Sequence, residues 1–190
     1  MNNDKDGRSG SVPVADVMEN ASAEFLKQAS QYSSDLSVWT KLYAANRTML
    51  SAMREQKVGP ALVEICSNLL GCEELAIIEI ERPTEKIHFI SVEGLRPEFS
   101  AALVQNVRTL ESWIKPGNPE IAFDETANSS GLRSLGISAL IPLWADEQSS
   151  AAIVLFQLLP QRTGFDAEDR EVLQLLALYA GPCLRSQTRG

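Results

Sequence analysis

Four side chains offer nucleophilic, metal-binding or general-base chemistry: the three cysteines and the one histidine of the chain. Cys66 falls in an apolar helical run and Cys72 in the turn after it, while Cys183 lies in a second apolar run. His88 stands inside an expected strand with no motif around it. Metal sites and hydrolytic triads need such residues at a defined spacing or beside a placed base. The sequence therefore predicts no catalytic residue, no metal and no cofactor, and it predicts cysteines buried as small hydrophobic residues.

A phosphate-binding loop is not expected either. Residues 131–136 begin and end with glycine, but they lack the lysine and the strand-to-helix setting of a P-loop. The formal net charge of −8 argues against binding to nucleic acid or to an anionic membrane, because both draw on clustered Lys and Arg. These features point away from an enzyme and from a nucleic-acid or membrane partner.

The composition suits one domain with an additional helical segment. The chain has 190 residues, of which 44% are hydrophobic. No run of about 18 apolar residues marks a membrane span. Residues 1–12 lack the basic start and apolar centre of a secretory signal, and we expect a disordered tail there. An odd number of cysteines fits a reducing compartment, so we expect a cytoplasmic protein.

Residues 13–57 are expected to form two helices, with a break where Ser33, Ser34 and Asp35 interrupt the apolar spacing. The second helix, at residues 35–56, places apolar residues at alternating three- and four-residue steps with one polar position among them. The members of this seam are Leu36, Trp39, Tyr43, Asn46, Leu50 and Met53. Two interpretations stay open: the seam is half of a homodimer interface, or it packs along its own domain.

Residues 58–186 alternate between helical and strand-like patterns, and residues 187–190 form a short tail. The expected elements are a helix at 60–70 ended by Gly71, a hairpin of strands at 75–80 and 87–92, a short helix at 98–107, a short strand at 121–123, a loop at 126–130, a hairpin of strands at 137–144 and 151–158, and a helix at 167–184 that Gly181-Pro182 ends or kinks. Because Pro142 has no backbone donor, we expect it near an edge, an end or a bulge.

This order of elements resembles the GAF family. The helix and strand at residues 62–76, the Glu93-Gly94-Leu95 turn, the Leu140-Ile-Pro-Leu143 strand and the Phe165-Asp-Ala-Glu168-Asp169 helix start are similar in kind to motifs of that family. The resemblance covers roughly residues 40–186. It implies an α/β (α+β) fold, with a central antiparallel sheet of five to six strands, helices packed on one face, a ligand pocket on the other, and here an N-terminal helical extension.

The known ligands of such domains find little support in this chain. Relatives that bind cyclic nucleotides carry Asn-Lys and a later Phe-x-x-x-Asp-Glu, whereas here Asn118 lacks the Lys and Phe123-Asp124-Glu125 has the wrong spacing. Bilin-binding relatives attach the chromophore through a cysteine, and residues 97–135 contain none. Heme needs an axial ligand, for which His88 is the one histidine. Relatives that reduce free methionine sulfoxide use pocket cysteines in an arrangement that these cysteines do not match.

Candidate pocket residues therefore come from the fold resemblance alone: Phe89, Phe99, Trp113, Phe123, Arg133 and Trp144. The alternative interpretation is that the aromatic residues are ordinary core and that Arg133 is a solvated charge.

The resemblance implies a non-catalytic regulatory module of a bacterial-type signalling system. We expect it to act as a homodimer through protein contacts, with a degenerate pocket. Because the chain carries no recognisable kinase, cyclase or DNA-binding segment, a signal is expected to pass to other signalling proteins. Two alternatives stay open: a small-molecule sensor with an unidentified ligand and, with less support, an enzyme that acts on a thiol or a sulfoxide.

Overall fold

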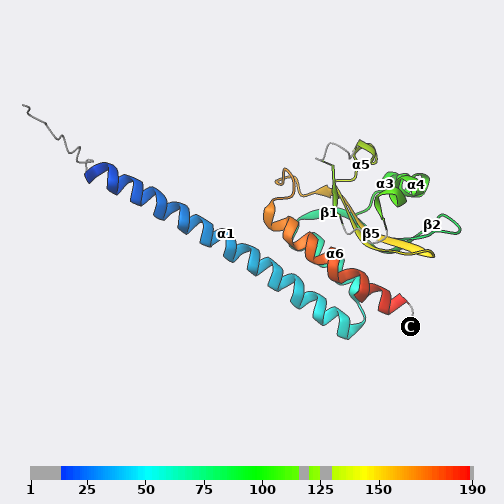
Figure 1. Ribbon diagram of the computed structural model, residues 1–190. Helices are drawn as coiled ribbons and strands as arrows, with labels where there is room; N and C mark the ends of the chain where they lie inside the picture. The colour runs from blue at the N-terminus through cyan, green and yellow to red at the C-terminus, as the bar shows by residue number, and fades with distance from the viewer. Residues whose placement is uncertain (1–13, 116–119, 125–129, 189–190) are drawn as a thin grey trace, which may run out of the picture. The chain divides into compact units, whose positions relative to one another are not determined.

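The computed structural model describes residues 14–115, 120–124 and 130–188 (Figure 1). The chain divides into two compact units, Met1–Trp39 and Thr40–Gly190. Sequence analysis places the boundary after residue 57 instead. The predicted N-terminal tail lies outside the described residues, and so does most of the predicted loop at 126–130.

Helix α1, Val14–Glu55, is continuous, so the predicted break at residues 33–35 is wrong. Ser and Asp each cost a helix well under 1 kcal/mol relative to better helix formers, and neither glycine nor proline is present there. Starting a new helix costs more than extending an existing one, which favours continuation through these polar residues. Residues 14–39 of α1 belong to the first unit.

The second unit is built on a five-stranded antiparallel sheet, as predicted. The strands are β1 (Cys72–Glu81), β2 (Lys86–Glu93), β3 (Ala122–Phe123), β4 (Ala139–Ala145) and β5 (Ser149–Leu158), and their order across the sheet is β2-β1-β5-β4-β3. Both predicted hairpins are present, β1 with β2 and β4 with β5. The register shifts between Pro142 and Trp144, and β3 pairs only with Ala139 and Leu140. The prediction that Pro142 lies at a bulge or an edge is therefore confirmed.

Helices α2 (Val58–Asn68) and α6 (Ala167–Thr188) cover one face of the sheet, together with residues of α1 from Ala45 onward. Alternation along β1 divides its side chains between the faces: Leu75 and Ile77 join this cluster, while Ala76 and Ile78 point to the other side. After α2 the chain turns at Gly71, whose φ of +66° is a conformation that glycine adopts without strain. We call this the α2/α6 face.

Short helices lie against the opposite face: α3 (Pro97–Gln105), α4 (Val107–Trp113) and α5 (Ser130–Ser134). We call it the α3/α4 face. The helix predicted at 98–107 is α3, and α4 was not predicted. Asn106 has a non-helical backbone, and its side-chain amide donates to the Ala102 carbonyl at 2.8 Å beside the bond of its own backbone N–H to that carbonyl at 3.1 Å.

Helix α6 continues through Gly181-Pro182 to Thr188, so of the two predicted effects of this pair, an end or a kink, the end is wrong. A β-carbon built on Gly181 would lie 2.2 Å from the Leu143 carbonyl oxygen, so this glycine allows α6 to approach the backbone of β4. Arg185, one turn further on, forms an ion pair with Asp146 in the β4–β5 turn and lies over the ring of Trp144. These contacts hold the last turns in place after the proline has removed one helical hydrogen bond.

Candidate functional site

The α3/α4 face, where the resemblance implies a ligand pocket, carries a buried cluster of the chain's own apolar side chains. The buried members of this cluster are Ala76, Ile78, Ile80, Leu103, Val107, Leu110, Ile114, Ala122, Leu132, Ile137, Leu140, Ala152, Val154 and Phe156. Ligand sites are concave and include a few polar groups that orient the ligand. This buried cluster contains hydrophobic residues only.

Polar groups occur at one end of the same face. Arg82 and Glu111 approach to 3.7 Å, and Ser150, which pairs with Ile80 in the sheet register, is fully buried. Within the described part of the chain, Ser150 Oγ has no hydrogen-bond partner. A buried hydroxyl of this kind is commonly satisfied by an ordered water, so these groups do not by themselves form a ligand site.

Three of the six predicted pocket residues lie on the α3/α4 face. Phe99 stacks on Phe156 with ring centroids 4.7 Å apart, and Trp113 packs against the same cluster. Phe89 is opposite Ile78 in the register, and 40% of it is exposed. Phe99 and Trp113 are therefore part of the packing of this face, whereas Phe89 lies at its open margin.

The remaining three lie elsewhere. Phe123 and Trp144 pack into the cluster of the α2/α6 face, and Arg170 lies 4.1 Å from the centre of the Phe123 ring. The bulge after Pro142 causes this for Trp144, since it shifts the alternation of β4 by one residue. Arg133 is exposed on α5 and donates to the Asp124 carbonyl at 3.2 Å. The six residues are thus divided between the two sides of the sheet and do not surround one space. Asn118 and Glu125, considered for a cyclic-nucleotide motif, lie outside the described residues.

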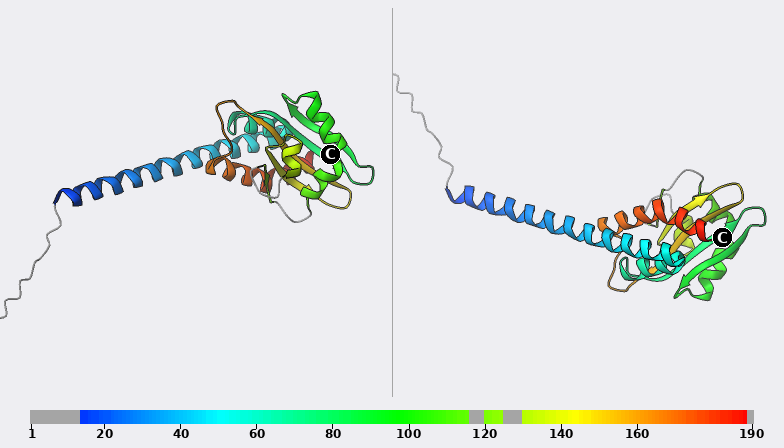
Figure 2. Two further views of the ribbon diagram at one scale, coloured as in Figure 1. Left: turned by 90° about the horizontal axis from the view of Figure 1, so that it is seen from above. Right: turned by 90° about the horizontal axis from the view of Figure 1, so that it is seen from below.

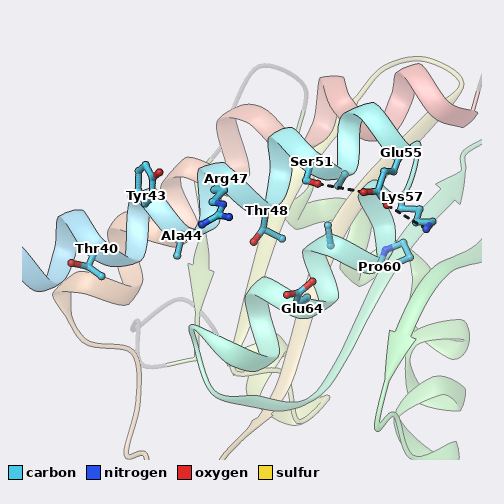
Figure 3. A pocket seen from close by; sticks show the side chains of 12 residues that line it. Thr40, Tyr43, Ala44, Arg47, Thr48, Ser51, Glu55, Lys57, Pro60 and Glu64 are labelled. Atoms are coloured by element: carbon cyan, nitrogen blue, oxygen red, sulfur yellow. Dashed lines mark hydrogen bonds and ion pairs between the residues drawn. The ribbon is translucent and has the colours of Figure 1, made fainter.

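A groove of about 600 Å³ runs between α1 and α2 (Figure 3). Ser51 Oγ donates to Glu55 across 3.5 Å, and Lys57 Nζ lies 3.3 Å from the same carboxylate. The lining residues are Thr40, Tyr43, Ala44, Arg47, Thr48, Ser51, Ala52, Glu55, Lys57, Pro60, Ala61 and Glu64. Charges of both signs line an open surface here, an arrangement suited to protein contacts more than to an enclosed ligand.

A second hollow, of about 480 Å³, lies between α6 and the segment that contains β3. Its lining residues are Glu120, Ile121, Phe123, Arg170, Gln174, Ala177 and Leu178. Phe123 thus lines a described pocket, although on the side of the sheet opposite to the one that the resemblance implies.

The predicted helical seam points outward. In the second unit, 69% of Tyr43 and 51% of Leu50 are exposed, and Asn46 and Met53 are exposed as well. In the first unit, Leu36 and Trp39 are also exposed. The part of α1 in the second unit packs onto its own domain through a different set of residues: Ala45, Met49 and Ala52. Within the second unit, Tyr43, Asn46 and Leu50 therefore do not pack into the core of their own domain.

Helix α6 lies beside the cyan end of α1 in Figures 1 and 2. Lys41 Nζ is 3.2 Å from Asp169 Oδ1 near the start of α6, and Met53 Sδ is 3.4 Å from Cys183 Sγ near its end. The two helices therefore run in the same direction, and each residue of α1 lies beside a residue of α6 that comes about 129 positions later in the chain. That offset places Tyr179, another exposed residue, level with Leu50. Exposed apolar residues therefore occur at the same level on both helices.

A buried carboxylate ties α1 to α6. Asp169 has no exposed side-chain area and forms ion pairs with Lys41 and with Arg162, which precedes α6. It also accepts a hydrogen bond from the Asp166 backbone at 3.1 Å, while its own backbone N–H donates to Asp166 Oδ1. Burial raises the pKa of Asp169, an effect that the two cations and this hydrogen bond oppose. The arrangement fixes the position of Lys41 and hence of the outward seam.

Comparison with solved structures identifies the fold. No sequence model of a protein family matches the chain, and no curated protein matches it. The GAF domain of a protein described as a sensor histidine kinase, from Pseudomonas syringae pv. tomato, superposes with a TM-score of 0.54. That match covers 85% of this chain and 94% of the other, at 18% identity. The chain has a GAF-like fold.

Two further structures resemble this GAF-like domain. One is a domain of a two-component sensor histidine kinase protein from Sinorhizobium meliloti, with a TM-score of 0.46, 16% identity and coverage of 70% of this chain and 92% of the other. The second is the GAF domain of an Acinetobacter phosphoenolpyruvate-protein phosphotransferase, with a TM-score of 0.46, 14% identity and coverage of 75% and 93%.

The thiols of the GAF-like domain are poor nucleophiles. Burial raises the pKa of Cys66 far above its ordinary value and that of Cys72 to about 12. Cys183 is partly exposed, and burial raises its pKa as well. His88 is exposed on β2 with Nε2 3.8 Å from Glu81 Oε2. Among the described residues, no group of three or more His, Cys, Asp or Glu is placed to hold a metal ion, and no helix is long and apolar enough to cross a membrane.

Two features of the GAF-like domain were not found from the sequence. The position of Tyr179 beside α1 and the ion pair of Asp169 with Lys41 both depend on the pairing of α1 with α6. Lys41 and Asp169 are 128 residues apart, and helical periodicity says nothing about such a distance.

Proposed function

We propose that this protein is a non-catalytic regulatory module of GAF type that acts as a homodimer and passes its signal to other signalling proteins through α1 and α6. The observation that carries the proposal is the outward apolar seam of α1. The similar GAF domain from Pseudomonas syringae belongs to a protein described as a sensor histidine kinase, which supports a role in signalling.

The seam favours a second copy of this chain as its partner. Leu36, Tyr43 and Leu50 occupy one heptad position and Trp39, Asn46 and Met53 the other, so the helix presents a stripe that repeats every seven residues. In a two-fold pair, Asn46 meets the same residue of its partner. An amide both donates and accepts hydrogen bonds, which makes this polar position complementary to itself.

Charges beside the seam favour a parallel pair. Arg47 and Arg54 occupy the same flanking position in successive heptads. In an antiparallel pair this position faces its own equivalent, which would bring arginines together. In a parallel pair it faces the opposite flank, where Leu42 and Met49 lie, and the repulsion is avoided.

The apolar cluster packed on the α3/α4 face supports a degenerate pocket. A sensor with a dedicated ligand needs a cavity with orienting polar groups, and the buried cluster on that face is apolar. The raised pKa values of the buried thiols support a non-catalytic role. The sensor and the thiol or sulfoxide enzyme are therefore less well supported than the interaction module.

The test is the mass in solution of the double variant Leu50→Glu/Met53→Glu. At low micromolar concentration the wild-type chain should have the mass of a dimer by light scattering, and the double variant the mass of a monomer, with an unchanged circular dichroism spectrum. Val104→Glu is the matched control, because Val104 is an equally exposed apolar residue on α3. A folded double variant that stays dimeric would rule out this interface.

A further inference from the structure

Strand β2 is an open edge of the sheet. It stands at the end of the strand order, with β1 as its neighbour. Within the described part of the chain, its backbone hydrogen bonds go to β1. Figures 1 and 2 show β2 at the rim of the second unit. An unpaired edge presents N–H and C=O groups that can pair with another strand. Of its eight residues, Lys86, His88, Phe89, Val92 and Glu93 are exposed.

The opposite edge of the sheet is less suited to pairing. Strand β3 has two residues, and beyond it β4 carries Pro142 and a bulge. Proline is among the features that block edge-to-edge association. Strand β2 contains no proline, and its apolar residues Phe89 and Val92 are 40% and 49% exposed. The two edges therefore differ, and β2 is the one available to a partner strand.

The bulge within β2 selects the kind of partner. Ile78 pairs with Phe89 and Ile77 with Ser91, so Ile90 is an extra residue without an opposite number in β1. A regular strand would lose register on crossing this point. Consider a second β2 that pairs antiparallel with the first, related to it by a two-fold axis between Phe89 and Ile90. Its own extra residue, Ile90, then also lies next to the axis. The ladder then stays in step on both sides.

The faces of the strand agree with this pairing. Lys86, His88, Ser91 and Glu93 pair with residues of β1 whose side chains point to the α2/α6 face, and Ile87 and Val92 with residues that point to the α3/α4 face. The two-fold pairing sets Lys86 against Glu93, Ile87 against Val92 and His88 against Ser91 of the second copy. Each of these three pairs shares a face, as a continuous sheet requires, whereas the central residues Phe89 and Ile90, at the bulge, lie on opposite faces.

Charge distinguishes this register from its neighbours. Lys86 and Glu93 stand at the two ends of the strand. In this pairing, Lys86 of each copy lies opposite Glu93 of the other, so opposite charges meet at both ends. A shift of one residue would place paired side chains on opposite faces. A shift of two would shorten the overlap to six residues and separate Lys86 from Glu93.

We propose that β2 is a self-complementary docking edge, which pairs antiparallel with β2 of a second copy about a two-fold axis between Phe89 and Ile90. This contact is separate from the helix seam and does not rest on it. An edge contact of eight residues is at the weak end of specific interfaces. Its expected role is to join chains, or dimers formed through α1, at high local concentration.

Disulfide trapping tests the register. In a Cys183→Ser background, the variant Lys86→Cys/Glu93→Cys should form a covalent dimer on mild oxidation, because residues 86 and 93 of the two copies lie opposite each other. Neither single variant should form a covalent dimer, since residues 86 and 93 each lie roughly 23 Å from their own equivalents in this pairing. The variant His88→Cys/Glu93→Cys, which bridges the register shifted by two, should also stay monomeric. Equal trapping in all of these, or none in the first, would overturn the proposal.

The same trapping in the Leu50→Glu/Met53→Glu background separates this contact from the helix seam. A covalent dimer that persists there supports the β2 edge whatever the outcome for the seam, whereas its loss there would overturn a separate contact.

Charge reversal provides a second measurement. In sedimentation experiments on the Leu50→Glu/Met53→Glu chain at high concentration, Lys86→Glu should weaken self-association several-fold, and Lys86→Glu/Glu93→Lys should restore it. Failure of the double reversal to restore association would contradict the pairing of these two residues.

Discussion

Replacing Gly181 by alanine should destabilise the GAF-like domain even though alanine is the better helix former. The added Cβ would lie 2.2 Å from the Leu143 carbonyl oxygen, whereas ordinary contact begins at 3.4 Å. Because both partners belong to backbone, no flexible side chain can move aside. Helix α6 must shift by about 1 Å relative to β4 to restore contact distance.

The size of the effect follows from two opposing terms. Overpacking of a well-packed site costs about 1–3 kcal/mol. Replacing glycine by alanine within a helix returns about 0.8–1.0 kcal/mol. The clash involves two elements of the core, so we expect a value at the upper end of the first range and a net loss of about 1–2 kcal/mol in the free energy of unfolding.

Urea unfolding followed by circular dichroism, at one protein concentration, measures this loss. Gly131→Ala is the matched control, because a Cβ there would meet only a Thr109 methyl at 3.6 Å. That variant should be neutral or slightly stabilised. If Gly181→Ala were as stable as the wild-type chain, α6 could not cross β4 as closely as described, and the account of why the helix continues through Pro182 would fail.

Three further changes probe the charged cluster and the thiols. Asp169→Asn should lower the free energy of unfolding by about 1–3 kcal/mol in urea unfolding, because Lys41 and Arg162 lose their shared counter-charge. Lys41→Met should lower the free energy of unfolding less in the Asp169→Asn variant than in the wild-type chain. A thiol reagent at neutral pH should label Cys183 in the native protein and all three cysteines after unfolding; labelling of native Cys72 at the same rate would refute its burial. Since folding raises the pKa of Cys72 from 9.0 to about 12, that thiol stabilises the fold below pH 9 and the contribution declines as the pH rises toward 12, so Cys72→Ala should flatten the alkaline fall in stability.

The strands and hairpins could be predicted because their evidence is local. Alternating or continuous apolar runs mark β1, β2, β4 and β5, and the turns between them are short and polar. The start of β1 was missed for a tertiary reason. Glu74 lies within the strand and is buried, and its carboxylate pairs with Arg96 at 2.7 Å. A glutamate with a distant partner is indistinguishable in sequence from one in a loop.

The candidate site was harder to predict than the fold. Trp144 was assigned to the pocket from the fold resemblance alone, and the bulge after Pro142 turns it to the other side of the sheet. The seam of α1 was recognised from its spacing, but whether it faced the domain or the solvent depends on which stripe the sheet covers. Ala45, Met49 and Ala52 provide the covered stripe because small and flexible side chains allow α1 to pack closely.

The central claim is that α1 pairs with α1 of a second copy in a parallel, in-register arrangement. Asn46→Cys in a Cys183→Ser background tests it most directly, since residue 46 meets its own equivalent only in that arrangement. Mild oxidation at low micromolar concentration should convert this variant to a covalent dimer, while Val104→Cys, equally exposed on α3, should remain monomeric. An Asn46→Cys chain that stays monomeric, or that is trapped no faster than Val104→Cys, would contradict the claim.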